Sequence, residues 1–375
     1  MEQLPNDIIN IIKDFMLFRP KTKAELQKAV NLWCKYYYKN PSSSKSITSN
    51  NEVLKKSKRL RNKVLNRYGY ISTWDTSLIT DMSKLFYEKY SFNDDINNWD
   101  VSSVTDMSFM FFSASSFNRQ LNSWDVSSVT DMSYMFDKAE LFNQPLNSWN
   151  VSSVTNMRNM FCGAKRFNQP LNSWNVSSVT NMRRMLSLTN SFNQPLDSWN
   201  VSSVINMDNT FSYSNFNQPL DSWNVSSVID MNGMFQCAYR FNQPLNSWDV
   251  SSVTNMKQMF HDSYDFNQPL NSWDVSKVID MREMFRGAEK FNQPLNSWDV
   301  SKVIDMREMF FCAKSFNQPL NSWDVSKVID MHGMFANAYS FNQSLNSWDV
   351  SSVNTMKFMF EKSFGRKNAL WYDFD

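Results

Sequence analysis

The sequence predicts an α/β solenoid, in which about twelve repeats of 25 residues stack into one right-handed array. The first observation is the regular spacing of tryptophan, which recurs every 25 residues, with one interval of 24. The second is the segment FNQPLNSW or FNQPLDSW, which occurs eight times between Phe142 and Trp323. A fixed period of this length is typical of solenoids, propellers and linear arrays. The recurring tryptophans are Trp74, Trp99, Trp124, Trp149, Trp174, Trp199, Trp223, Trp248, Trp273, Trp298, Trp323 and Trp348.

The apolar residues inside one repeat predict a short strand. In the segment LNSWNVSSV, Leu146, Trp149, Val151 and Val154 follow the pattern L-x-x-W-x-V-x-x-V. This matches the spacing of leucine-rich repeats, with Trp and Val in the inward positions. The alternating stretch SWNV is flanked by turn-forming residues, which indicates a strand of a few residues.

The following residues predict about two turns of helix. Ser153 is placed to cap a helix N-terminus, and Val154, Met157, Met160 and Phe161 then recur at helical spacing. Each repeat would therefore consist of one strand and one short helix. Such a unit buries its apolar side only when neighbouring repeats stack on it.

Three columns of identical residues are expected to be structural. The Trp and Met columns should fill the core, because Met packs well into irregular gaps. The Asn that follows each first Phe of the repeat should hydrogen-bond the backbone of an adjacent repeat, as an internal ladder. This column consists of Asn143, Asn168, Asn193, Asn217, Asn242, Asn267, Asn292, Asn317 and Asn342.

A fourth column, directly after each Trp, is the candidate partner-binding strand face. Its acidic members should repel one another across adjacent strands. A cation or a basic partner would relieve that repulsion, as would water together with Lys277, Lys302 and Lys327. Calcium is not expected, because calcium-binding repeats are rich in glycine and this chain has only 6 Gly. After Asp75 the column continues with Asp100, Asp125, Asn150, Asn175, Asn200, Asn224, Asp249, Asp274, Asp299, Asp324 and Asp349.

Residues 1–70 differ in composition and predict a small helical head before the array at 71–360 and a cap or tail at 361–375. The head holds 15 basic and 5 acidic residues, whereas the remainder holds 23 basic and 31 acidic residues. Three helices are expected: one after Pro5, one opened by a capping box from Thr22 to Glu25, and one closed by Gly69. They would form a bundle or cap the first repeat. The run KKSKRLRNK at 55–63 fits a solvated helix face or a nucleic-acid or nuclear signal, and nucleic-acid binding is not favoured.

Neither secretion nor membrane insertion is expected from the sequence. The start MEQLPNDIIN lacks the apolar run of a signal peptide, and no stretch approaches the roughly 18 apolar residues of a membrane span. Cys162, Cys237 and Cys312 lie 75 residues apart, too far to pair in a stacked array. These features predict an intracellular protein with free thiols.

The repeat resembles the BspA-type leucine-rich repeat family, on the residues FNQPLNSWDVSSVTDMSYMF and the variant first unit YGYISTWDTSLITDMSKLF. The resemblance covers about residues 68–360. That family occurs in bacterial surface lipoproteins and in large DNA viruses, so it implies binding and adhesion. For a viral member, the host cytoplasm or the virion is the implied location.

The first residues also resemble the opening of an F-box, the module that docks substrate adaptors onto Skp1–cullin ubiquitin ligases. The resemblance implies contact of residues 1–40 with a Skp1-like protein. The matching residues are Leu4, Pro5, Ile8, Ile11, Ile12 and Phe15. A plain helical cap is the alternative for this segment.

These patterns predict a non-enzymatic scaffold that binds a protein partner. His261 and His332 lie outside any metal-binding spacing, and no catalytic residues, glycine-rich phosphate loop or cofactor site is expected. The alternatives are an F-box-like adaptor and a structural surface or virion component. The positions that vary lie around Arg158, Arg183, Arg184, Lys257, Arg282 and Arg307, on the side of the expected helices that faces solvent.

Overall fold

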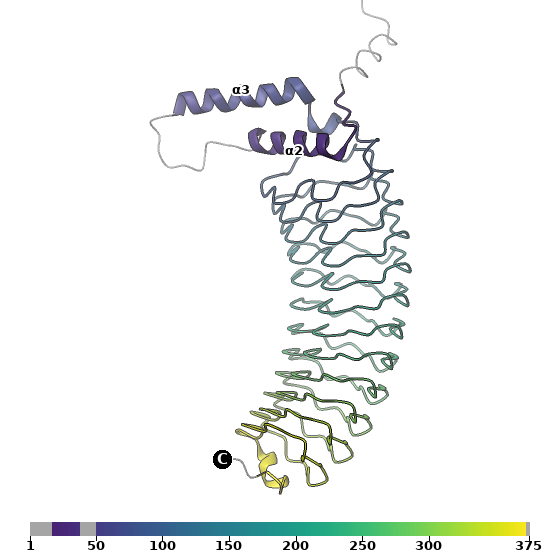
Figure 1. The fold of residues 1–375 in the computed structure, drawn as a ribbon, viewed down its shortest axis with the longest axis vertical. Helices are drawn as coiled ribbons and strands as arrows, with labels where there is room; N and C mark the ends of the chain where they lie inside the picture. The colour runs from purple at the N-terminus through teal and green to yellow at the C-terminus, as the bar shows by residue number, and fades with distance from the viewer. Residues whose placement is uncertain (1–16, 38–49, 373–375) are drawn as a thin grey trace, which may run out of the picture.

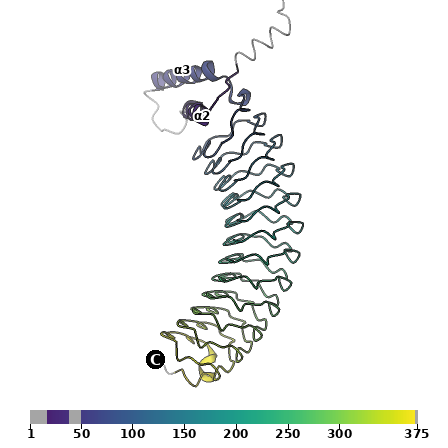
Figure 2. The same cartoon turned by 45° about the vertical axis from the view of Figure 1, so that its right-hand side comes forward.

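The chain forms a curved column of stacked coils, one coil for each repeat, in the computed structural model (Figure 1). The model describes residues 17–37 and 50–372. Two helices, α2 (Lys23–Tyr37) and α3 (Asn50–Tyr68), lie at the N-terminal end of the column. Short 3₁₀ helices follow at Ile71–Thr73 (η2) and, at the opposite end, at Phe364–Asn368 (η3). A second view shows the same stacking and curvature (Figure 2).

The predicted helices of the head are confirmed where the structure describes them. The Glu25 N–H donates to Thr22 Oγ1 at 3.2 Å, and Glu25 Oε2 accepts the Lys21 N–H at 2.7 Å, which together satisfy free amides at the start of α2. Gly69 ends α3 with a left-handed φ of +66° and donates its N–H to Leu65 O at 2.8 Å. The helix expected after Pro5 lies outside the described residues.

Helix α2 caps the first coil of the array. Its apolar residues Leu26, Val30 and Trp33 are buried against the first repeats. Gln27 Nε2 donates to Leu85 O at 2.9 Å, so a carbonyl group at the end of the stack has a partner. Trp33 Nε1 donates to Asp94 Oδ2 at 2.7 Å. In the described part of the head, α2 therefore caps the first repeat, and it also packs against α3.

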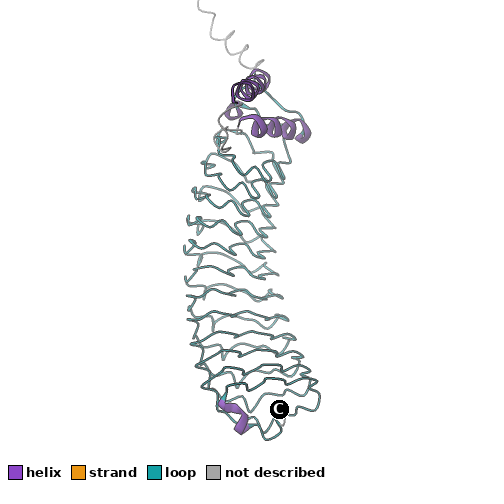
Figure 3. Ribbon diagram, turned by 90° about the vertical axis from the view of Figure 1, so that its left-hand side faces the viewer, coloured by secondary structure: helices purple, strands orange, loops and turns teal. Residues whose placement is uncertain are grey.

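The predicted α/β solenoid is wrong. Within the described repeats, from the first Trp to residue 363, the backbone forms neither strands nor helices, and the helices lie only at the two ends (Figure 3). Adjacent coils are instead joined by eleven isolated parallel bridges, each formed by one residue from each coil. The first bridge pairs Asp81 with Asp106, and the last pairs Asp330 with Thr355. The chain is therefore a stack of turns, not a leucine-rich repeat of strand and helix.

The expected strand is replaced by two linked turns. Asn150 Oδ1 accepts the Ser152 N–H at 3.2 Å. The Val154 N–H then donates to Val151 O at 2.9 Å and closes the next turn. Asp and Asn side chains that bond nearby amides compete with regular secondary structure. The backbone groups of SWNV therefore pair within their own coil and form no continuous ladder.

The expected helix is replaced by successive tight turns that also join the coils. The N–H groups of Met157 and Asn159 donate to the carbonyls of Asn181 and Arg183 in the next coil, at 3.0 and 2.8 Å. The Phe161 N–H continues this ladder to Met185 O at 3.0 Å, whereas the Met160 N–H, between Asn159 and Phe161, donates back to Met157 O at 3.1 Å. Asn159 has a φ of +56°, which an α-helix of L-residues excludes. Alternate amides thus bond the next coil, and the remaining amides bond within the turn.

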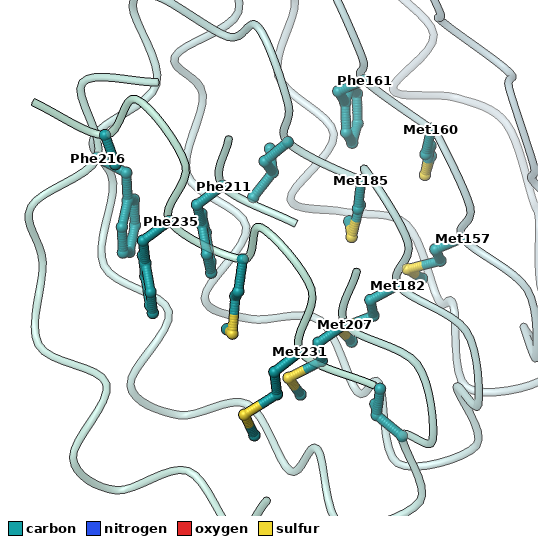
Figure 4. Packing of buried hydrophobic residues seen from close by; sticks show 14 of the residues in the cluster. Met157, Met160, Phe161, Met182, Met185, Met207, Phe211, Phe216, Met231 and Phe235 are labelled. Carbon is teal, nitrogen blue, oxygen red and sulfur yellow. The ribbon is translucent and has the colours of Figure 1, made fainter. Parts of the chain in front are cut away.

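The predicted packing of the Trp and Met columns is confirmed. Met157, Met182, Met207 and Met231 follow one another from coil to coil (Figure 4), and all four are fully buried. The Trp rings stack in parallel, with centroids 6.4 Å apart for Trp149 and its successor in the next coil. The indole N–H of Trp149 also donates to Leu121 O of the preceding coil at 2.9 Å. This contact recurs in other coils, so Trp supplies both apolar area and a hydrogen bond.

The predicted asparagine ladder is also confirmed. Asn143 Oδ1 accepts the Asn168 N–H at 2.9 Å, and Asn242 Oδ1 accepts the Asn267 N–H at the same distance. Gln268 Nε2 adds a second bond to Asn242 Oδ1 at 3.1 Å. Each Asn thus satisfies a backbone donor one coil away, which is the reason for its repetition.

Candidate interaction surface

The predicted Asp/Asn column lies at an exposed corner of the stack, although not on a strand. All eleven members from Asp100 to Asp349 are exposed. Each accepts the N–H of the residue two positions on through its Oδ1, as Asp125 does from Ser127 at 3.0 Å. Asp75, at the start of the column, is half-buried and pairs with Arg19 at 3.0 Å. The column therefore has one structural task, the closing of this turn, which both Asp and Asn can perform.

The second carboxylate oxygens of this column give the corner an acidic surface. The Ser276 hydroxyl and amide that bond Asp274 hold the pKa of its carboxyl below the ordinary value, and Ser301 does the same for Asp299. Asp249 and Asp274 each oppose the ionisation of the next member, so the expected repulsion along the column is present. The Ser hydrogen bonds outweigh it.

A second Asp/Asn column was not singled out from the sequence. It includes Asp131, Asn156, Asp280 and Asp305, and it forms the single-residue bridges between coils. Its side chains make the same hydrogen bond as those of the first column, to the N–H two positions on. Asp305 Oδ1, for example, accepts the Arg307 N–H at 3.0 Å. In the sequence, this column is visible as the Asp or Asn of the recurrent triplets T-D-M, T-N-M and I-D-M.

The residues that differ among repeats gather on one face, which we call the variable face. It consists of positions 133, 134, 137 and 138 and the equivalent positions in all the remaining coils. These positions flank the buried Met and Phe residues of the tight turns. The backbone under this face is the ladder of alternate amides, so neighbouring side chains stand in register from coil to coil. The predicted variable positions, including Arg158, Arg282 and Arg307, lie on it and are half-buried.

Aromatic stacking dominates the N-terminal part of the variable face. The rings of Phe109 and Tyr134 stack with centroids 4.3 Å apart, and those of Tyr87 and Phe112 stack at 4.9 Å. Arg158 covers the outer side of the Tyr134 ring at 5.4 Å. Half-buried aromatic rings beside cations are common anchors of protein interfaces.

Charged pairs dominate the C-terminal part of the same face. His261 Nδ1 lies 3.1 Å from Glu283 Oε2, and Gln258 Nε2 donates to the same oxygen at 3.0 Å. The His261 contact and the Gln258 bond lower the pKa of Glu283 to about 2. Arg286 pairs with Glu308 of the next coil and covers the Phe311 ring at 4.4 Å. The variable face thus changes character along the column while its backbone stays constant.

The variable face also holds buried polar groups, beside the aromatic stack of its N-terminal part. Asp137 is 4% exposed, and burial raises the pKa of its carboxyl to about 6. Asn159 Nδ2 donates to Asp137 Oδ2 at 3.2 Å. Burial likewise raises the pKa of the adjacent Cys162 thiol to about 11, so this thiol stays protonated at neutral pH. Cys34, Cys162, Cys237 and Cys312 are all free, as predicted.

The remaining predicted contacts cannot be placed. The F-box-like residues Leu4, Pro5, Ile8, Ile11, Ile12 and Phe15 lie outside the described residues. Within residues 17–37 and 50–372, no three His, Cys, Asp or Glu side chains are grouped to hold a metal ion. None of the helices in this part of the chain has the length and apolar character needed to cross a membrane.

Comparison with known proteins identifies the repeat. A family model described as "Mycoplasma protein of unknown function, DUF285" matches residues 55–165, 121–215, 212–286 and 269–371, which together span almost the whole array. No curated protein matches the chain. The overlapping matches follow the stacked coils from the third helix of the head to the C-terminal cap. The chain therefore belongs to the DUF285 family, a family of repeat proteins.

Proposed function

We propose that this protein is a non-enzymatic scaffold, acting inside the cell, that binds a protein partner through the variable face. The observation that carries the proposal is the contrast between this face and the rest of the coil. The Trp, Asn, Met and Phe columns are nearly invariant because each contacts its own equivalents in adjacent coils. The variable face has the same backbone but carries aromatic, polar and ionic residues in turn.

The resemblance to BspA-type repeats supports the same proposal, because it implies binding and adhesion. The Asp/Asn column is an alternative contact surface, since it is exposed and acidic at both ends of the array. Its turn role is identical in every coil, which favours the variable face as the surface that distinguishes one partner from another.

The F-box-like adaptor is a finer alternative. Because the apolar face of α2 is buried against the first repeats, a Skp1-like partner would have to use mainly residues 1–16. Binding of a Skp1 homologue that Ile8→Asp abolishes would favour this adaptor role. A virion or surface role has no supporting contact among the described residues.

Site-specific photo-crosslinking tests the scaffold proposal and its surface together. A benzoylphenylalanine would replace Tyr134 on the variable face, Asn175 in the Asp/Asn column, or the exposed Asn147, whose equivalents in neighbouring coils are Asn or Asp. Each variant would be irradiated in the cells that produce the protein. We expect one discrete protein adduct from position 134 and none from position 147. An adduct from position 175 alone would move the contact surface to the Asp/Asn column, and the absence of adducts from all three would contradict the scaffold function.

A further inference from the structure

The two ends of the stack are closed differently. At the N-terminal end, α2 covers the first coil, and Gln27 bonds Leu85 O. At the C-terminal end, Trp371 stacks on Trp348 at 6.4 Å and donates to Leu345 O at 2.8 Å, and Asn368 Nδ2 bonds Asn342 Oδ1 at 2.8 Å. These contacts close the Trp and Asn columns, and Tyr372 also reaches the tight turns, where its hydroxyl donates to Met356 O at 3.4 Å and its ring meets the Phe360 ring at 5.1 Å.

The tight turns of the last coil keep an open row of donors. In the preceding coil, the N–H groups of Met331, Gly333, Phe335 and Asn337 donate to carbonyls of the last coil at distances between 2.7 and 2.9 Å. The equivalent N–H groups of the last coil have no backbone acceptor among the described residues. We call this row the C-terminal edge, and its donors belong to Met356, Phe358, Phe360 and Lys362.

The surroundings of the C-terminal edge are basic and partly apolar. Residues 355–372 contain four basic residues and one acidic residue, although the chain after residue 70 is acidic overall. Lys357 and Lys362 are exposed, and Phe358 is 59% exposed. Together with Arg366 and Tyr372 they line a groove of about 580 Å³. Among the described residues that line the groove, the one acid is Glu361, whose Oε1 lies 3.9 Å from Lys362 Nζ.

We propose that the C-terminal edge binds an acidic, extended peptide segment of a partner protein. A row of backbone donors at alternate residues matches a chain that presents alternate carbonyls along one side. Peptides commonly bind to an open row of backbone groups in this way, while side chains provide specificity. Lysines around the row select negative charge. A second copy of this chain is a poor occupant, because α2 covers the matching carbonyl end of its array.

The experiment uses the full chain and two labelled ten-residue peptides, one of alternating Glu and Thr and one of alternating Lys and Thr. Fluorescence anisotropy should detect the acidic peptide and not the basic one. The double variant Lys357→Glu, Lys362→Glu should weaken binding about tenfold or more. The control Lys302→Glu, Lys327→Glu reverses two exposed charges on the Asp/Asn corner and should leave the affinity unchanged.

Hydrogen exchange provides the readout that simple charge attraction would not change. The amides of residues 356–362 should exchange more slowly when the acidic peptide is bound. Unchanged exchange there, or equal weakening by both double variants, would overturn the proposal. A chain ending at Tyr372 tests whether the last three residues of the chain occupy the groove themselves. If the peptide bound more tightly without Asp373, Phe374 and Asp375, these residues would be the occupant, and the proposal of an external partner would be overturned.

Discussion

Individual residues were the most predictable part of this structure. The ladder of Asn168 and its equivalents followed from one argument, since a polar residue identical in every repeat must satisfy a group that is also identical in every repeat. The burial of Trp149 followed in the same way. Its bond to Leu121 O did not, because the register between coils cannot be counted from one repeat. The Asp/Asn column was placed outward correctly, although its Asx turn was not foreseen.

Asp137 provides a pH-dependent test at the residue scale. Its carboxyl has a pKa of about 6 in the folded chain because it is buried, against about 4 when unfolded. Since the folded form favours the neutral acid, its stabilisation is complete below pH 4 and is lost as pH rises through 6. Asp137→Asn keeps an acceptor for Asn159, so at pH 8 the variant should be more stable by about 3 kcal/mol, with no gain at pH 4. Thermal unfolding at both pH values measures the difference.

Asp125→Asn is the control with the opposite sign. The Ser127 hydroxyl and amide hold the pKa of the Asp125 carboxyl below its ordinary value, so the charged form stabilises the fold above the unfolded pKa. This variant should lose stability at pH 8, and the loss should shrink as the pH falls from the unfolded pKa through the lower folded pKa. If both variants responded to pH in the same direction, the burial argument for Asp137 would be wrong.

At the scale of elements, the sequence predicted the helices of the head and failed in the repeat. Val154, Met157, Met160 and Phe161 have the spacing of a helix, but successive tight turns also bring every third or fourth residue to the same side. Glycine is the residue that distinguishes the tight turns from a helix in this sequence. Gly163, at a position with φ of +70°, marks a left-handed site that a helix would not contain. The varying positions were predicted to share a solvent-facing side, but their register from coil to coil follows from the amide ladder, which the expected helices would not form.

Leu188 tests the left-handed turns directly. It occupies the position of Gly163 one coil later, is 38% exposed, and has a φ of +58°. A Cβ in this conformation costs about 1 kcal/mol, which glycine avoids. Leu188→Gly should therefore be more stable than Leu188→Ala by about that amount, in chemical denaturation of both variants. In a helix the order would be reversed, so an alanine variant more stable than the glycine variant would contradict the turn geometry.

At the scale of the whole molecule, the period predicted a linear stack in which each repeat contacts its neighbours, and this is what the coils show. The class of the stack could not be predicted, because the same 25-residue period accommodates strands with helices or turns alone. What decides between them is the pairing of amides with the next coil, as the Met157 N–H pairs with Asn181 O. That pairing depends on the register of one coil relative to the next, and this register cannot be read from the sequence of a single repeat.

If every internal coil is equivalent, one complete coil can be removed without changing the others. Deleting residues 268–292 joins Asn267 to Gln293 and restores the native segment FNQPLNSW. The Trp273 ring and its bond to Leu245 O are lost, but Trp298 takes over both contacts. We expect a folded chain with unchanged tryptophan emission and modestly lower stability, because array stability is a sum over repeats and their interfaces. Deleting only residues 268–279 is the control, since it places Asp280 at the position of Gln268, with Met281 and Arg282 at the positions of Pro269 and Leu270, and so shifts the columns out of register. Tryptophan fluorescence and circular dichroism should then show loss of the stack, and equal tolerance of both deletions would mean that the coils are not held by their register.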